Sequence, residues 1–203
     1  MSTIVSKLPE EDFSNPLERL KDSHRRIEKF LDLTLVLASK TSSIPSPADR
    51  EHLNVALRYL RKGPRTHSED EEISLFPRLR EVTKCELTPE LLRVNTLEDE
   101  HNAAAHSHRL VEELFERWLR NGPLNRDQHK QIVELTRLLR EAYRTHIEFE
   151  DTVLFPLASK LLSDEQLDAM GLEMLRRRAR ASAVSNSHSK CTARRKLNYS
   201  PSI

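Results

Sequence analysis

Residues 65–77 read RTHSEDEEISLFP, and residues 144–156 read RTHIEFEDTVLFP. Both stretches contain Arg-Thr-His, a glutamate four residues after the histidine, and a closing Leu-Phe-Pro. A shorter repeat precedes each copy, because LKDSH at 20–24 matches LEDEH at 97–101. The sequence therefore has two halves, and each half carries a single-histidine motif followed by a His-x-x-x-Glu motif.

Composition and periodicity predict an all-α protein. Only 3 of the 203 residues are glycine, and Leu, Glu, Arg and Ala are abundant. Apolar residues recur at spacings of three and four in four long segments, which indicates amphipathic helices over about 15–40, 47–83, 88–120 and 125–157. Gly63-Pro64 predicts a kink or short break in the second helix, because proline removes an internal hydrogen bond.

Short loops between four long helices favour an up-down-up-down antiparallel four-helix bundle. We expect this bundle to span residues 14–162. The flanking segments are an irregular lead-in at 1–13, a short C-terminal helix at 163–182 with Ser163 as its N-cap, and a disordered basic tail at 183–203.

Charge and cysteine content bear on partners and location. The formal net charge is +1, but eight basic residues and no acidic residue follow Glu173, so the remainder carries −7. The tail lacks interleaved aromatic residues apart from Tyr199, so we expect no nucleic-acid binding except through its basic runs. Two distant cysteines form no disulfide framework, no apolar run approaches 18 residues, and the N-terminus lacks the apolar run of a signal peptide. These features predict a cytoplasmic protein without a membrane span.

Six polar side chains fall on the apolar faces of the predicted helices. They are His24, His67, Glu71, His101, His146 and Glu150. A buried carboxylate is costly unless basic residues, protonation or a metal neutralise it, and the basic residues of these helices lie mostly off the apolar faces. Histidine and glutamate together are ligands for iron, manganese or zinc. Each His-x-x-x-Glu pair shares one helix face.

The expected heights of the four histidines agree. At about 1.5 Å per residue, His24 and His101 lie about 15 and 18 Å from the starts of their helices, and His67 and His146 lie about 20 Å from the ends of theirs. An antiparallel bundle brings these ends together, so the histidines should meet at one level. Six ligands exceed one tetrahedral zinc site but suit two metals bridged by both glutamates; the histidines of each metal stay unassigned.

Four stretches resemble the hemerythrin-like, or HHE cation-binding, superfamily: DSHRRIEKFL, HSEDEEISLFP, EDEHNAAAHSHRL and HIEFEDTVLFP. The resemblance covers about residues 14–162 and implies a four-helix bundle that holds two non-haem iron ions with an oxo or hydroxo bridge. Matched residue by residue, it implies the same six ligands, with Glu71 and Glu150 as bridges. Within the acidic run 69–72, only Glu71 is then expected to touch metal, and the others should form a solvated face.

The sequence departs from the oxygen-carrying members of that superfamily. They place a second histidine on the third helix where this chain has Ala105, and an aspartate where this chain has Asp151. Asp151 is therefore either the alternative ligand to Glu150 or a residue that supports a ligand. His108 is either a residue that supports the site or a hydrogen-bonded core histidine. Phe76 and Phe155 of the Leu-Phe-Pro repeats are expected to pack at the bundle end.

Three classes of function follow. The resemblance favours a protein that binds or senses dioxygen or nitric oxide, or handles iron. The alternative is a di-iron redox enzyme, with an unidentified redox partner, that turns over peroxide or nitric oxide or repairs iron–sulfur centres. A purely structural bundle is the third class. A ferritin-like oxygenase needs Glu-x-x-His on two helices, whereas the repeated motif here has the order His-x-x-x-Glu, so that class is disfavoured. A zinc peptidase is disfavoured because His-Glu-x-x-His is absent.

Overall fold

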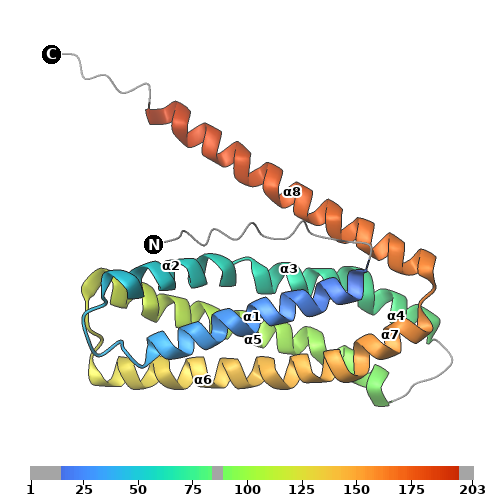
Figure 1. Ribbon diagram of the computed structural model, residues 1–203, viewed down its shortest axis with the longest axis horizontal. Coiled ribbons are helices and arrows are strands. Elements are labelled where there is room, and N and C mark those ends of the chain that lie inside the picture. The colour runs from blue at the N-terminus through green and yellow to red at the C-terminus, as the bar shows by residue number, and fades with distance from the viewer. Residues whose placement is uncertain (1–14, 84–88, 197–203) are drawn as a thin grey trace, which may run out of the picture. The chain divides into compact units, whose positions relative to one another are not determined.

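The computed structural model describes residues 15–83 and 89–196, and it is all-α in this part of the chain. The chain divides into two units, and Leu17–Ser163 forms the helical bundle (Figure 1). The bundle contains α1 (Pro16–Ala38), α2 (Pro47–Leu60), α3 (Gly63–Asp70), α4 (Phe76–Val82), α5 (Pro89–Asn121), α6 (Arg126–Phe149) and α7 (Phe155–Leu161). Two short π-helical segments, η1 (Glu71–Leu75) and η2 (Glu150–Leu154), join α3 to α4 and α6 to α7.

Local sequence signals determine where these helices begin and end. Ser46 and Asn125 cap α2 and α6, and each forms a capping box with the residue three positions later. Gly122 has φ +83°, a conformation that ends α5 at little steric cost. The predicted break at Gly63-Pro64 is confirmed, because α2 ends at Leu60 and α3 begins at Gly63.

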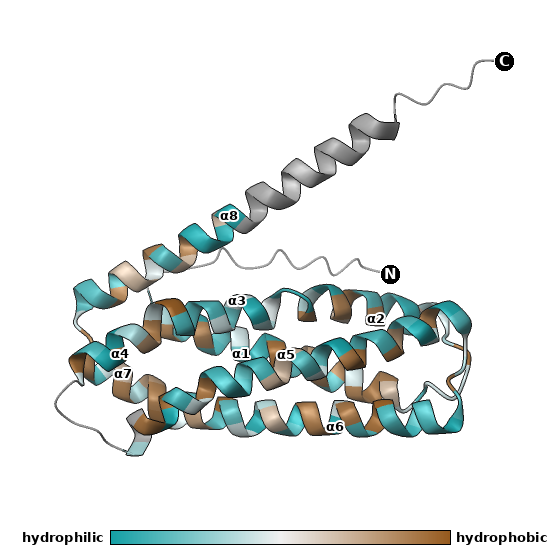
Figure 2. Cartoon of the chain, turned by 180° about the vertical axis from the view of Figure 1, so that it is seen from behind, coloured by the Kyte–Doolittle hydropathy of each residue, from teal (hydrophilic) through white to brown (hydrophobic). Residues whose placement is uncertain are grey.

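The long helices lie side by side, and each contacts the next along the chain. The rings of Phe30 in α1 and Tyr59 in α2 are 4.5 Å apart, α2 packs on α5, and α5 packs on α6. The last helix also contacts the first, because Arg140 of α6 forms an ion pair of 2.5 Å with Asp32 of α1. Figure 2 shows hydrophobic residues at intervals along these helices between hydrophilic ones, as amphipathic helices around a shared core require.

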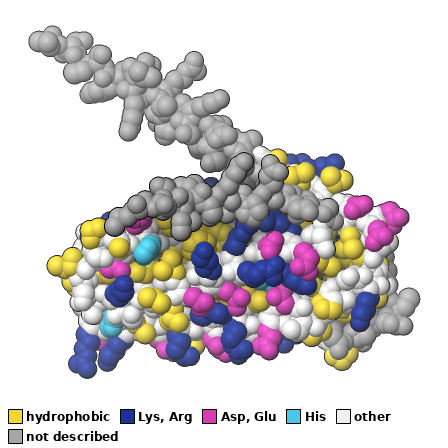
Figure 3. Space-filling view, in the orientation of Figure 1, with side chains coloured by type: hydrophobic (Ala, Val, Ile, Leu, Met, Phe, Trp, Pro, Cys, Tyr) yellow, Lys and Arg dark blue, Asp and Glu magenta, His cyan; other side chains and the backbone are white. Residues whose placement is uncertain are grey.

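The two loops 39–46 and 122–125 meet over the apolar core. Leu124 donates its backbone N–H to Thr41 O at 2.8 Å, and Trp118 donates its indole N–H to Ser43 O at 2.7 Å. Trp118 and Phe115 are fully buried in a cluster that includes Ile27, Leu53 and Ile132. Basic and acidic side chains intermingle on the visible bundle surface (Figure 3), which is ordinary for a solvated face.

The π-helical segments explain how proline is tolerated between α3 and α4 and between α6 and α7, where the chain stays helical. In an α-helix the ring of Pro77 would clash with the carbonyl of Ile73, and Pro156 would clash with Thr152. Phe76 instead donates its N–H to Glu71 O, and Phe155 donates to Glu150 O, so one extra residue is accommodated in each turn. The sequence predicted ordinary helix here. Each π-helical segment begins at the glutamate of a His-x-x-x-Glu motif.

The second unit contains α8, which runs from Asp164 to Lys196. It starts directly after Ser163 as expected, but its helical backbone extends past residue 182, into the segment predicted to be disordered. Residues 197–203, the lead-in at 1–13 and Cys85 lie outside the described residues. In the part that the structure describes, every helix is too short or too polar to cross a bilayer.

Candidate metal centre

Six side chains from α1, α3–η1, α5 and α6–η2 converge inside the bundle. They are His24 of α1, His67 of α3, Glu71 of η1, His101 of α5, His146 of α6 and Glu150 of η2. Both glutamates and His24 are fully buried, and the other three histidines are at least nine-tenths buried. The structure thus brings together all six residues that the sequence singled out.

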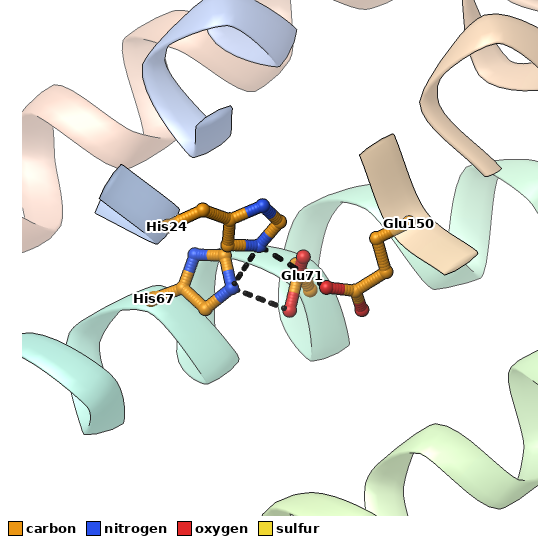
Figure 4. A group of neighbouring side chains, drawn as sticks. All are labelled: His24, His67, Glu71 and Glu150. Carbon is orange, nitrogen blue, oxygen red and sulfur yellow. Dashed lines mark hydrogen bonds and ion pairs between the residues drawn. The ribbon is translucent and has the colours of Figure 1, made fainter. Parts of the chain in front are cut away.

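These residues form two overlapping groups, each able to hold a metal ion. One group is His24, His67, Glu71 and Glu150; the other is Glu71, His101, His146 and Glu150. Within a group the candidate ligand atoms all lie within 4.8 Å of one another. Figure 4 shows the first group, in which the side chains point toward one another from separate helical segments.

Both glutamates face both groups. Glu150 Oε2 lies 3.1 Å from His24 Nε2, while Glu150 Oε1 lies 3.0 Å from His146 Nε2. Glu71 Oε2 lies 3.3 Å from His67 Nε2 and 3.4 Å from His101 Nε2. Each carboxylate is therefore placed where it could contact two neighbouring cations.

Three of the four histidines are oriented by a second carboxylate on the far side of the ring. Nδ1 of His24 lies 2.8 Å from Asp151 Oδ1, and Nδ1 of His101 lies 2.8 Å from Glu72 Oε1. Since a carboxylate accepts hydrogen bonds, each Nδ1 carries the proton and its Nε2 is available toward the centre. His146 Nδ1 makes the same contact with Glu100 Oε2 at 2.7 Å.

The phenylalanines of the Leu-Phe-Pro repeats also support these rings. Phe155 stacks on His24 with ring centroids 5.4 Å apart, and Phe76 stacks on His101 at 6.3 Å. Both phenylalanines are buried. They pack against histidine rings at the centre, a role that the sequence analysis did not assign to them.

The donor set is incomplete without a cation. Nε2 of His24 lies 2.9 Å from Nε2 of His67, and Nε2 of His101 lies 3.1 Å from Nε2 of His146. Two nitrogen lone pairs at this distance repel unless a proton or a metal lies between them. The carboxylate oxygens of Glu71 and Glu150 accept no directed hydrogen bond from the described residues, although they are buried. Nitrogen and oxygen donors thus converge on points that a cation would satisfy.

Protonation partly compensates in the metal-free state. Burial lowers the pKa of His24, but the hydrogen bond with Asp151 and the contact with Glu150 outweigh it and raise that pKa to about 10. For His146, burial is likewise outweighed by Glu150, and the pKa rises to about 9. Burial and the repulsion from Glu150 raise the pKa of Glu71 to about 7. Burial opposes ionisation of Glu150, but His146 and His24 hold its pKa well below the usual range.

The structure also places the neighbouring residues for which the sequence leaves alternatives open. Asp151 lies on His24 Nδ1 and belongs to neither four-residue group, so it supports a histidine. His108 forms a hydrogen bond of 3.1 Å with Tyr143 Oη and belongs to neither four-residue group, and burial lowers its pKa to about 4. The prediction of a solvated acidic face is wrong for Asp70, which is fully buried. Glu72 is partly exposed and also accepts a hydrogen bond from His101.

Two cavities reach the centre beside α5. One, of about 410 Å³, is lined by His101 and His146 and by apolar side chains that include Ala104, Leu139 and Ala142. The other, of about 490 Å³, is lined by His101 and by polar side chains that include Arg61, Arg65 and Glu72. Ala105 lines this second cavity. Small side chains on α5 therefore leave space next to one of the two groups.

Comparison with known families agrees with this geometry. Residues 15–158 match the family described as the Hemerythrin HHE cation binding domain. No curated protein matches the chain. The match covers both four-residue groups and most of the 203-residue chain. The chain therefore belongs to the hemerythrin HHE cation-binding family, and its buried His/Glu cluster is the candidate cation site.

Proposed function

We propose that this protein holds a non-haem di-iron centre and binds a small molecule, such as dioxygen or nitric oxide, beside it. In this proposal His24 and His67 hold one iron, His101 and His146 hold the other, and Glu71 and Glu150 bridge them. The supporting observation is the pair of four-residue groups that share both carboxylates.

The donor chemistry supports iron over the alternatives. Imidazole and carboxylate donors together suit iron and manganese, whereas structural zinc sites are closed tetrahedral sites with cysteine and histidine ligands. Four protein ligands per metal leave room for further ligands around a six-coordinate ion. When bound, iron would supply reversible electron transfer and an open position for a diatomic molecule.

The protein's own residues would control access to that position. His101 and His146 line the cavity of about 410 Å³ together with alanine and leucine side chains and the charged residues Arg93 and Glu100. A cavity of this size has room for a small uncharged molecule beside the two histidines. The buried carboxylates of Glu71 and Glu150 would offset part of the positive charge of two cations.

We also infer the up-down-up-down order of the helices and a cytoplasmic location. The order is supported by the contact between loops 39–46 and 122–125 and by the convergence of the four histidines. The location is supported by two cysteines that form no disulfide framework in the sequence.

The first experiment measures metal content. Protein purified from iron-replete cells should contain about two irons per chain and show near-ultraviolet ferric absorption. Glu71→Ala and Glu150→Ala should each abolish binding of the pair. Glu69→Ala is the control, because Glu69 is partly exposed and belongs to neither four-residue group. Iron-free protein would refute the proposal, and retention of both irons in either variant would refute the bridging role of that glutamate.

A second experiment separates binding from catalysis. Dioxygen, nitric oxide or peroxide is added in turn to the reduced, iron-loaded protein, and the absorption spectrum is followed. A stable adduct that reverses when the gas is removed supports the binding function. Consumption of many equivalents per chain would instead support the di-iron redox enzyme.

A further inference from the structure

The two halves of the centre are not equivalent, and the difference lies at His67. His24, His101 and His146 each donate Nδ1–H to a carboxylate. His67 Nδ1 is buried and has no hydrogen-bond partner among the described residues, and the side chain is only 3% exposed. One imidazole of the four therefore lacks the contact that the other three share.

The internal repeat explains this gap. LKDSH aligns with LEDEH, so Ser23 occupies the place of Glu100, one residue before the histidine in each case. Glu100 reaches His146, but Ser23 is too short to act in the same way toward His67. The Ser23 hydroxyl instead donates to the backbone carbonyl of Arg19 at 3.2 Å.

The supporting contact made by the residue after each buried glutamate, in contrast, is present in both halves of the chain. Glu72 follows Glu71 and accepts from His101, and Asp151 follows Glu150 and accepts from His24. This contact supports one histidine in each group, His101 in one and His24 in the other. Glu100 supports His146 as well, so the group with His101 and His146 has two supported histidines. The group with His24 and His67 has only one.

We propose that the two cation positions are unequal, that the position at His101 and His146 fills first and binds more tightly, and that Glu100 sets the difference. This inference rests on the proposed function. A carboxylate on Nδ1 fixes the ring and makes Nε2 a stronger donor, and loss of such a partner typically costs about 10- to 100-fold in metal affinity. His67 lacks both effects, so the cation that it holds should be the more labile one.

The test titrates metal-free protein with Co²⁺ and follows calorimetry and the visible absorption of the ion. Two binding steps are expected, with the first about 10- to 100-fold tighter than the second. Glu100→Ser copies the Ser23 half onto the other half, so it should lower the first binding constant by that factor and leave the second unchanged. Glu100→Gln keeps an acceptor oxygen without the charge and should lose less.

Ser23→Ala is the matched control, because the Ser23 hydroxyl contacts only a backbone carbonyl in the hydrogen bonds described. It should leave both constants unchanged. Glu100 is 40% exposed, so its replacement should be tolerated, and circular dichroism verifies folding. Equal constants in the unmodified protein, an unchanged first constant in Glu100→Ser, or loss confined to the second constant would each overturn the inference. Failure to bind any Co²⁺ would refute the cation site itself and with it both proposals. The three outcomes above would overturn only the inequality of the two positions and leave the proposed function standing.

Discussion

Replacing Glu71 with glutamine should stabilise the metal-free protein while it abolishes binding of the metal pair. Glu71 and Glu150 are both fully buried and face the same small space. Without a cation, the charge of Glu71 is opposed by burial and by Glu150. The amide introduced at position 71 removes that charge, keeps the size of the side chain, and can donate to the carboxylate of Glu150.

The magnitude follows from the pKa of Glu71. A rise from the usual 4.5 to about 7 means that ionisation of this group costs the folded state about 3 kcal/mol. The glutamine removes this cost, but its buried amide has incomplete hydrogen bonding, which destabilises the folded state by about 1 kcal/mol or more. We therefore expect Glu71→Gln to raise the free energy of unfolding by about 1–2 kcal/mol at pH 8.

The pKa of Glu71 also predicts how the stability difference between Glu71→Gln and the unmodified protein changes with pH. A carboxyl group whose folded pKa lies above its unfolded pKa contributes its stability fully below the unfolded value, about 4.5, and loses it as the pH rises through about 7. The amide penalty does not depend on pH, so Glu71→Gln should be less stable than the unmodified protein by about 1 kcal/mol near pH 4.5, where Glu71 is protonated and its ionisation costs almost nothing. The difference should reverse in favour of Glu71→Gln between pH 5 and 7 and then level off.

Urea denaturation in the presence of a chelator, at pH 4.5, 6 and 8, measures this difference. Glu69→Gln is the matched control, because Glu69 is 38% exposed and pairs with Arg65, so its loss should change stability by less than about 0.5 kcal/mol. With excess iron the order should reverse, because only the unmodified protein gains the binding free energy. An equal destabilisation of Glu71→Gln at pH 4.5 and pH 8 would refute the reasoning.

Three further predictions concern the surroundings of the site. Glu72→Gln should weaken metal binding by about 10- to 100-fold without unfolding the protein, measured by Co²⁺ titration; unchanged affinity would contradict the supporting role of Glu72 at His101. Phe155→Ala should lower the free energy of unfolding by about 3–5 kcal/mol in urea, because it empties a buried site against a histidine ring; a loss below about 1 kcal/mol would contradict this packing role. Asn125→Ala removes the cap of α6 and should cost about 1 kcal/mol in the same assay, whereas no change would show that the capping box contributes nothing.

The sequence repeat predicted much of the centre because its information is local. His67 and Glu71 lie on one helix face at a fixed spacing, and His146 and Glu150 repeat that spacing, so periodicity alone places each pair. Helix boundaries at Pro47, Gly63 and Gly122 were equally readable, because each residue restricts the backbone in a known way.

The supporting contacts could not be read in the same way. Glu72 reaches His101, and Glu100 reaches His146, across two different helices. Such contacts depend on helix rotation and on the extra residue in η1 and η2, which the sequence analysis did not anticipate. The available signals were the acidic residue after the glutamate of each His-x-x-x-Glu motif and the proline that ends each repeat. A proline within a helix, however, more often predicts a kink than a wider turn.

The exchange of supporting contacts between the two halves has a consequence for how the chain could be divided. His24 belongs to the first half, but its carboxylate partner Asp151 and its stacking partner Phe155 belong to the second. A fragment limited to α1–α4 would keep His24, His67 and Glu71 and lose both partners of His24 together with Glu150. Such a fragment could rebuild a complete cation site only by pairing with a second copy of itself, as a dimer of half-length chains would.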